Sequence, residues 1–331
     1  MLEHNNEPTN LSEPEPDKQE TNKTVEQSSQ ENVLKSVPLT CVVCAICILI
    51  FIGASQEKDL ESWDAVTKWG FYSPQSIWGG KYWGLITSVF VHFQIWHVGF
   101  NVYWLWILGG AIEKTIGSLK WLILFLAAAF VSSGIEFAAS TAKGGGSGIG
   151  LSGVIYAMFG FIWVTRDRYE LFINTLPKET INTLMLWLFL CIPLTLLNIL
   201  NVGNEAHFSG LLFGSCVGSA YVLKYKPRLM IAGQVLLFIL AVVPLFWWPF
   251  SVDWVSKQAH DAHIKQDYQT AINWYQKSLT LGQDPKWVWT NLAIVYKNLN
   301  NQTKYEEALD KLRTLSPDEA KKLEQELQES N

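Results

Sequence analysis

Long apolar segments separated by short polar ones fill the chain between residues 36 and 250. A helix needs about 20 residues to cross the hydrocarbon core of a bilayer, and seven segments approach that length. They lie near residues 36–54, 94–112, 120–139, 150–165, 181–200, 205–224 and 229–248. After residue 250 the pattern changes to that of amphipathic soluble helices. We therefore expect an all-α protein, with a polytopic helical membrane bundle at 36–250 and a small soluble helical domain at 251–331.

The distribution of charge supports this division. Residues 1–35 contain eight acidic and three basic residues, residues 249–331 contain twelve and ten, and the 213 residues between them contain only ten and twelve. The first 35 residues have too few apolar side chains to form a core, so we expect a disordered acidic tail, and they lack the basic start of a signal peptide. The net charge of −5, without a basic stripe, argues against nucleic acid as a partner.

The basic residues of the loops indicate an orientation in the cell membrane. If the N-terminus is cytoplasmic, the loops at 113–119, 166–180 and 225–228 and their edges face inward and carry eight Lys and Arg residues. The outer loops carry four, so the positive-inside rule favours this topology. Seven spans then place the C-terminal domain on the extracytoplasmic side, which in a bacterium is the periplasm or the cell exterior.

A glycine-rich segment opens the fourth predicted span. It contains Gly150-Leu151-Ser152-Gly153, preceded by Gly144-Gly145-Gly146-Ser147-Gly148. A serine at a helix N-terminus has free backbone N–H groups beside its hydroxyl, and these groups can stabilise a developing oxyanion. A packing face of small residues is the alternative interpretation, since Gly and Ser allow membrane helices to approach closely.

The sixth predicted span begins with a histidine and a glycine series. His207 is followed by Gly210, Gly214 and Gly218, which recur at every fourth residue and form a smooth helix face. A histidine in hydrocarbon is best kept neutral, and neutral imidazole is the general base that a serine nucleophile needs. A helix-packing motif with an interhelical hydrogen bond from the histidine remains equally open on these residues alone.

The second predicted span begins with two histidines and an asparagine. His97 and Asn101 are four residues apart and share one helix face, and His92 precedes them. The side chains of His97 and Asn101 can donate hydrogen bonds to an oxyanion without carrying a fixed charge. Clustered imidazoles can also bind metal, but no acidic residue has a suitable ligand spacing, so we expect no metal and no other cofactor. The predicted topology places Ser152, His207 and His97 at a similar depth near the outer face.

Together these motifs resemble those of the rhomboid family of intramembrane serine proteases, over residues 36–224. The resemblance rests on His92-(x)4-His97-(x)3-Asn101, Leu108-Gly109-Gly110-Ala111-Ile112-Glu113-Lys114, Gly150-Leu151-Ser152-Gly153-Val154-Ile155-Tyr156-Ala157 and Ala206-His207-(x)2-Gly210-(x)3-Gly214. It implies a six-span rhomboid-like core with one extra C-terminal span. It also implies a serine-type endopeptidase that cleaves transmembrane segments of membrane proteins, which enter laterally from the lipid bilayer.

The resemblance also implies roles for individual residues. Ser152 would be the nucleophile and His207 the general base of a dyad without an acidic third member. His97, Asn101 and the Ser152 backbone N–H would form the oxyanion hole, and Tyr156 would pack against His207. The residues expected in support are His92, Gly150, Gly153, Tyr156, Gly210 and Gly214.

One departure from the family pattern lies in the first outer loop. The family commonly has Trp-Arg there, whereas this chain has Trp83-Gly84, which puts a hydrogen-bonding anchor of that loop in doubt. The alternative function is a catalytically weak or silent rhomboid-like protein that binds membrane proteins as an adaptor. Such relatives normally lose the serine or the histidine, and both are present here.

Residues 251–331 contain two blocks that resemble tetratricopeptide helix pairs. The first contains Ala271-(x)3-Tyr275-(x)2-Ser278, and the second contains Trp289-(x)2-Leu292-Ala293-(x)2-Tyr296 and Ala308-(x)3-Leu312-(x)2-Leu315. Each repeat of this class buries its face on a neighbour, and two repeats are few, so a plain helical hairpin is the alternative. We expect this domain to bind a protein partner or substrate near the site.

Overall fold

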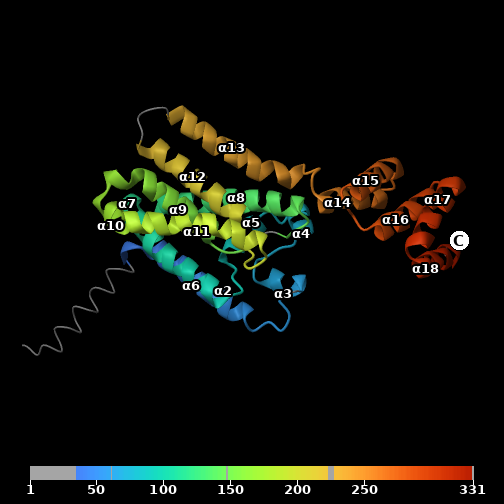
Figure 1. Cartoon of the computed structure of the whole chain (residues 1–331), viewed down its shortest axis with the longest axis horizontal. Coiled ribbons are helices and arrows are strands. Elements are labelled where there is room, and N and C mark those ends of the chain that lie inside the picture. The colour runs from blue at the N-terminus through green and yellow to red at the C-terminus, as the bar shows by residue number, and fades with distance from the viewer. Residues whose placement is uncertain (1–34, 61, 147, 223–226, 330–331) are drawn as a thin grey trace, which may run out of the picture.

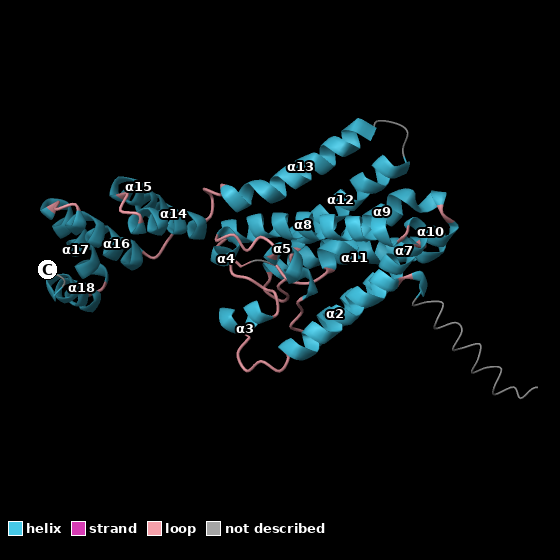
Figure 2. Cartoon of the chain, turned by 180° about the vertical axis from the view of Figure 1, so that it is seen from behind, coloured by secondary structure: helices cyan, strands magenta, loops and turns pink. Residues whose placement is uncertain are grey.

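The computed structural model describes residues 35–60, 62–146, 148–222 and 227–329. The tail predicted at residues 1–35 lies almost wholly outside the described residues. Within them every regular element is a helix (Figures 1 and 2), which confirms the predicted all-α class.

Each of the seven predicted spans corresponds to a helix or a run of helices. They are α2 (Pro38–Ala54), α6 with η2 and α7 (Ile95–Trp104, Leu105–Gly109, Gly110–Ile116), α8 (Ser118–Ala142), α9 (Ser152–Thr165), α11 (Lys178–Leu196), α12 (Asn204–Val222) and α13 (Pro227–Phe246). Four are long and apolar enough to cross a membrane: Ile95–Ile116, α8, α11 and α13. These helices support a multi-pass membrane protein.

The helices α2, α9 and α12 are shorter or less apolar than these four. The apolar helix α2 has 17 residues and α9 only 14, while α12 is rich in glycine and serine. Eleven of the 14 residues of α9 are buried, and α12 and α8 pack directly on it. The short helix α9 is therefore the centre of the bundle, and the longer, more apolar helices surround it.

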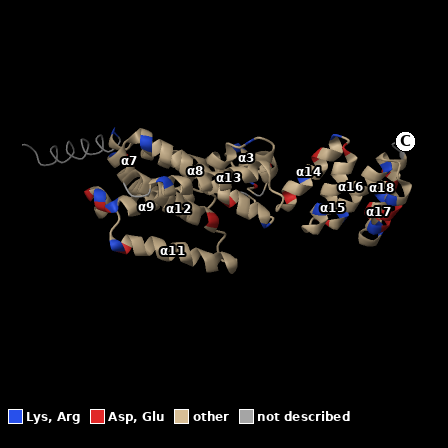
Figure 3. Ribbon diagram, turned by 90° about the horizontal axis from the view of Figure 1, so that it is seen from above, with Lys and Arg blue, Asp and Glu red and all other residues tan. Residues whose placement is uncertain are grey.

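Short helices fill the longer loops. The first loop contains α3 (Trp63–Lys68), α4 (Pro74–Trp78), α5 (Gly84–Thr87) and η1 (Ser88–Phe90), and the loop after α9 contains η3 (Arg166–Arg168) and α10 (Glu170–Thr175). Figure 3 shows that charged residues gather at the ends of the bundle and over the C-terminal domain, leaving the spans almost free of charge. This distribution is the one expected of helices surrounded by lipid.

The C-terminal domain consists of five consecutive helices with their own core. They are α14 (Val252–Ile264), α15 (Tyr268–Thr280), α16 (Pro285–Asn298), α17 (Gln302–Leu315) and α18 (Pro317–Glu329). The side chains of Ser251, Asp267, Asp284 and Asn301 each accept a hydrogen bond from a backbone N–H in the first turn of the following helix, which explains where α14 to α17 begin. Neighbouring helices pack in sequence order. The tetratricopeptide assignment stays a prediction.

The first helix of this domain contacts the membrane bundle. Trp254 and Val255 of α14 share a buried apolar cluster with Ile77 and Trp78 of α4 and with Phe137 of α8. The Trp78 indole N–H also donates to the Pro244 carbonyl at 2.9 Å. The C-terminal domain is therefore docked on the first loop and on the adjoining ends of α8 and α13.

Candidate functional site

The helices α9 and α12 lie side by side and approach so closely that their contact depends on glycine. A Cβ atom added to Gly210 would overlap the Gly153 carbonyl oxygen, and one added to Gly214 would overlap the Ala157 carbonyl oxygen. A Cβ atom on Gly153 would in turn lie 3.2 Å from the Ala206 carbonyl oxygen. Residue numbers rise together along both helices, so the two run parallel and their N-termini lie at the same end.

Ser152 is the first residue of α9 and is half-buried. Its backbone N–H therefore has no carbonyl partner four residues earlier in the helix. Gly150, two residues before it, has φ +94°, a conformation that favours glycine, and its N–H donates to the Ser88 carbonyl at 3.1 Å. The segment before Ser152 is thus bound to η1 of the first loop, which fixes where α9 begins.

His207 lies in the first turn of α12 and is only 3% exposed. Its ring centroid is 4.7 Å from that of Tyr156, and the Tyr156 hydroxyl donates to the Leu184 carbonyl of α11 at 3.0 Å. The Nδ1 atom of His207 has no hydrogen-bond partner among the described residues. Aromatic packing against Tyr156 therefore holds the imidazole, and no carboxylate bonds to it in the part of the chain that the structure describes.

Gly153, the residue after Ser152, lies against Ala206 and Gly210, which precede and follow His207 in α12. The sequence motifs of the fourth and sixth predicted spans thus meet at one end of one helix pair. A direct bond between the Ser152 hydroxyl and the His207 imidazole remains a proposal.

The His97 ring lies against the backbone before Ser152. A Cβ atom on Gly150 would be 2.6 Å from His97 Nε2 and 3.3 Å from Asn101 Nδ2, so only glycine leaves room for both side chains here. Asn101 is buried and His97 is half-buried. The nitrogen atoms of both side chains therefore point to the turn that precedes the nucleophile candidate.

His92 is fully buried and connects the first loop, Asn101 and the turn before Ser152. Its Nδ1 lies 3.1 Å from the Phe90 carbonyl, which can only accept, so Nδ1 carries the proton. Its Nε2 then accepts from the Asn101 amide at 2.8 Å and from the Leu151 N–H at 3.5 Å. One Asn101 N–H is used in this bond, and the second remains available to the site.

The sequence did not identify all residues that shape this region. The carbonyl of Ser88 and the carboxylate of Glu136 both bind segments that lead to the candidate residues. No local pattern marks Ser88, and the sequence shows Glu136 only as an acidic residue in an apolar span, without its partner. Gly84, the departure from the family pattern, is buried at the start of α5. A Cβ atom there would be 3.0 Å from the Tyr72 ring, so the Tyr72 side chain occupies the space of a larger residue.

The fold and this arrangement define a class: a multi-pass helical membrane protein with serine, histidine and amide groups gathered at one end of a buried helix pair. Residues 79–224 match the sequence profile of the Rhomboid domain. The chain is 35% identical over 179 residues to the Rhomboid protease GlpG of Yersinia pseudotuberculosis serotype I (strain IP32953), and the alignment covers 54% of this chain and 60% of the relative. It is 33% identical over 180 residues to Rhomboid protease GlpG of Serratia proteamaculans (strain 568), covering 54% and 61%.

Residues 79–224 are therefore similar to the Rhomboid domain and to Rhomboid proteases. The chain spans about 60% of the length of the relatives it matches. The helices α13 to α18 follow the matched region 79–224.

Proposed function

We propose that this protein is an intramembrane serine protease that cleaves transmembrane segments of membrane proteins through a Ser152–His207 dyad. The observation that carries the proposal is the glycine-dependent packing of α9 on α12, which brings the turn of Ser152 beside that of His207. The similarity to Rhomboid proteases supports it. The helix pair supplies the alignment that a carboxylate supplies in soluble Ser-His-Asp triads.

In this mechanism the Ser152 hydroxyl attacks the scissile carbonyl, and His207 accepts its proton and later donates it to the leaving amine. The tetrahedral oxyanion is stabilised by the Ser152 backbone N–H together with His97 and Asn101. His92 orients the Asn101 amide through their 2.8 Å hydrogen bond. Tyr156 fixes the plane of the His207 ring, and no metal or cofactor takes part.

The substrate is a transmembrane protein that enters laterally and is cut near the outer leaflet. The N-terminus is cytoplasmic and the C-terminal helical domain extracytoplasmic, as the basic loops favour. The docking of α14 on α4 places the C-terminal domain at the same end of the bundle as α3 and α4 of the first loop. Its role is to bind a protein partner or the soluble part of a substrate, as tetratricopeptide-like repeats do.

Cleavage of a fluorescent transmembrane substrate in liposomes tests the proposal. We expect the intact protein to cleave and both Ser152→Ala and His207→Ala to lose at least about 10³-fold in kcat, the scale on which dyad members act. Reaction of Ser152 with a fluorophosphonate, followed by mass spectrometry of the labelled peptide, identifies the nucleophile independently. Equal cleavage by all three proteins, or none by the intact protein on a broad panel, refutes the proposal and leaves the adaptor function.

A further inference from the structure

A buried carboxylate lies in the C-terminal third of α8, next to the turn that carries His207. Glu136 is 8% exposed, and its Oε2 accepts the backbone N–H of Ala206 at 3.0 Å. Ala206 directly precedes His207. The first N–H groups of a helix have no partner within the helix, and a negative charge there is favourable. The Glu136 carboxylate therefore completes the N-terminus of α12.

Two loops that lead to the candidate residues leave room for this side chain. A Cβ atom on Gly203, just before α12, would lie 3.0 Å from the Glu136 carboxylate. A Cβ atom on Gly148, shortly before α9, would lie 2.7 Å from its Cγ. The Glu136 side chain is thus packed between the segment that leads to Ser152 and the segment that leads to His207.

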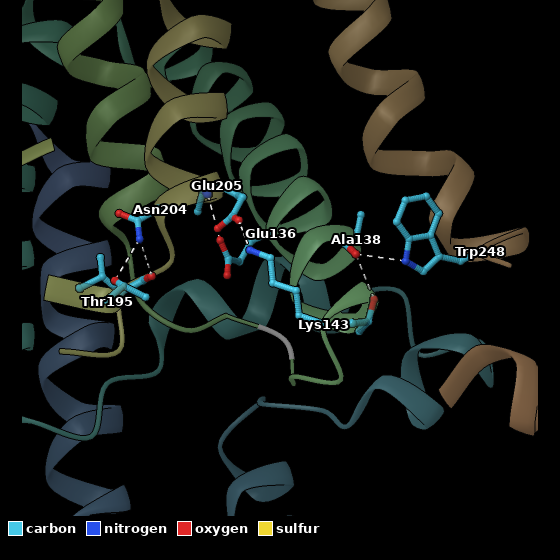
Figure 4. Close-up of polar contacts among 10 residues, drawn as sticks. Glu136, Ala138, Lys143, Thr195, Asn204, Glu205 and Trp248 are labelled. Atoms are coloured by element: carbon cyan, nitrogen blue, oxygen red, sulfur yellow. Dashed lines mark hydrogen bonds and ion pairs between the residues drawn. The ribbon is translucent and has the colours of Figure 1, made fainter. Parts of the chain in front are cut away.

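Two further side-chain contacts restrain the same turn of α12 (Figure 4). Lys143 forms a 2.5 Å ion pair with Glu205, and this hydrogen bond raises the pKa of the Lys143 ammonium. The Asn204 amide donates to the Thr195 hydroxyl of α11 at 3.0 Å. These two contacts are more exposed than Glu136, so of the three side-chain contacts the one made by Glu136 is the best shielded from solvent.

We propose that Glu136 is the positioning residue for the general base: it acts through the main chain of Ala206 and sets where His207 stands relative to Ser152. This inference rests on the proposed function. The proposed dyad has no acidic third member bonded to the imidazole. Glu136 would instead act on the backbone next to His207. A loss of this contact frees the first turn of α12, and displacements of about 1 Å cost on the order of 10²-fold in rate.

The test compares Glu136→Ala and Glu136→Gln with Glu113→Ala. Glu113 is a matched control because it is also buried, at 2% exposure, and its carboxylate accepts from the Thr40 N–H and hydroxyl, each at 2.8 Å, in another part of the bundle. Three quantities are measured: kcat and KM for a transmembrane substrate, the rate of fluorophosphonate labelling of Ser152, and the midpoint of thermal unfolding.

We expect Glu136→Ala to lower kcat and the labelling rate together by about 10- to 100-fold, with KM within twofold. Glu136→Gln keeps an oxygen acceptor for the Ala206 N–H and should retain more than about a third of kcat. Glu113→Ala should lower the unfolding midpoint at least as much, yet keep kcat within about threefold at temperatures where it is folded.

Three results overturn the inference: a kcat within twofold of the unsubstituted protein for Glu136→Ala, equal losses of kcat for Glu136→Ala and Glu113→Ala, or a Gln variant as slow as the Ala variant. Ser152→Ala separates this outcome from a failure of the proposed function. If Ser152→Ala abolishes cleavage while Glu136→Ala does not, only the positioning role falls.

Discussion

The contact between α9 and α12 predicts a graded response to alanine along one glycine series. Gly210, Gly214 and Gly218 face α9 in turn, and Gly210 lies one turn after His207. A carbon atom keeps about 3.3–3.6 Å from a carbonyl oxygen. The Cβ atom of Gly210→Ala would overlap the Gly153 oxygen, so the helices must separate by about 1 Å at the level of the dyad. The Cβ atom of Gly218→Ala would lie 3.0 Å from the Phe161 carbonyl oxygen. A separation of the helices by a few tenths of an ångström relieves that contact.

These displacements convert to different losses of rate. A misplacement of about 1 Å costs on the order of 10²-fold, so we expect Gly210→Ala to lower kcat by about that factor. Gly218→Ala acts about three helical turns beyond His207, and we expect less than about a threefold loss of kcat. Overpacking costs about 1–3 kcal/mol in stability, partly offset by the roughly 1 kcal/mol that alanine gains over glycine in a helix. Both variants should therefore remain folded.

The assay measures kcat for a transmembrane substrate in liposomes alongside the thermal unfolding midpoint. Gly99→Ala is the matched control, because Gly99 is an exposed helical glycine with open space where its Cβ would be. It should keep full activity. A kcat for Gly210→Ala within twofold of the control, or equal losses for Gly210→Ala and Gly218→Ala, would show that the helix separation does not set the dyad geometry.

Two predictions concern the C-terminal domain. Trp254 is 5% exposed in the cluster that joins α14 to the first loop. Trp254→Ala should lower the free energy of unfolding by about 3–5 kcal/mol and make residues 251–331 sensitive to limited proteolysis. Unchanged resistance to the protease would contradict the docking. His263, bonded to the Tyr275 hydroxyl at 3.1 Å, has a pKa lowered from 6.5 mainly by burial. Its neutral form thus stabilises the fold above about pH 6.5, and this contribution is lost as the pH falls. The protection factors of α14 and α15 amides, which are corrected for the intrinsic exchange rate at each pH, should therefore fall at pH 5, and should fall less in His263→Gln.

The helical class could be predicted because the apolar segments alone determine it. All seven predicted spans correspond to helical segments, and the ends of α8 and α13 differ from the prediction by two or three residues. The fifth span, predicted at 181–200, differs most, because α11 begins three residues earlier and ends four residues earlier. The helix of the second span continues four residues further than predicted, through wider π-helical turns at Leu105–Gly109 to Ile116. The sequence pattern stops at Ile112 because Glu113 and Lys114 follow. Glu113 is nevertheless buried, and it accepts hydrogen bonds from the N-terminus of α2.

The candidate site was only partly visible in the sequence. Short motifs place Ser152, His207 and Asn101 near helix ends because their spacing is local. The contacts that position them join residues far apart in the chain: Glu136 to Ala206, Ser88 to Gly150 and Tyr156 to Leu184. A lone carboxylate in an apolar helix signals a cost but not its partner. The partner of Glu136 follows only from the fold, which places the N-terminus of α12 beside its carboxylate.

The same part of α8 also supports the C-terminal domain. The Glu136 carboxylate binds the turn of His207, and the Ala138 carbonyl accepts the Trp248 indole N–H at 3.1 Å (Figure 4). Between them, the ring of Phe137 packs on that of Trp78, with the ring centroids 5.2 Å apart. Three consecutive residues therefore contact the candidate site, the first loop and the segment that joins α13 to α14. Because they belong to one helical turn, we expect that loosening the docked domain, as in Trp254→Ala, also shifts Glu136. A change in kcat on loosening that domain, at unchanged KM, is the signature of this connection.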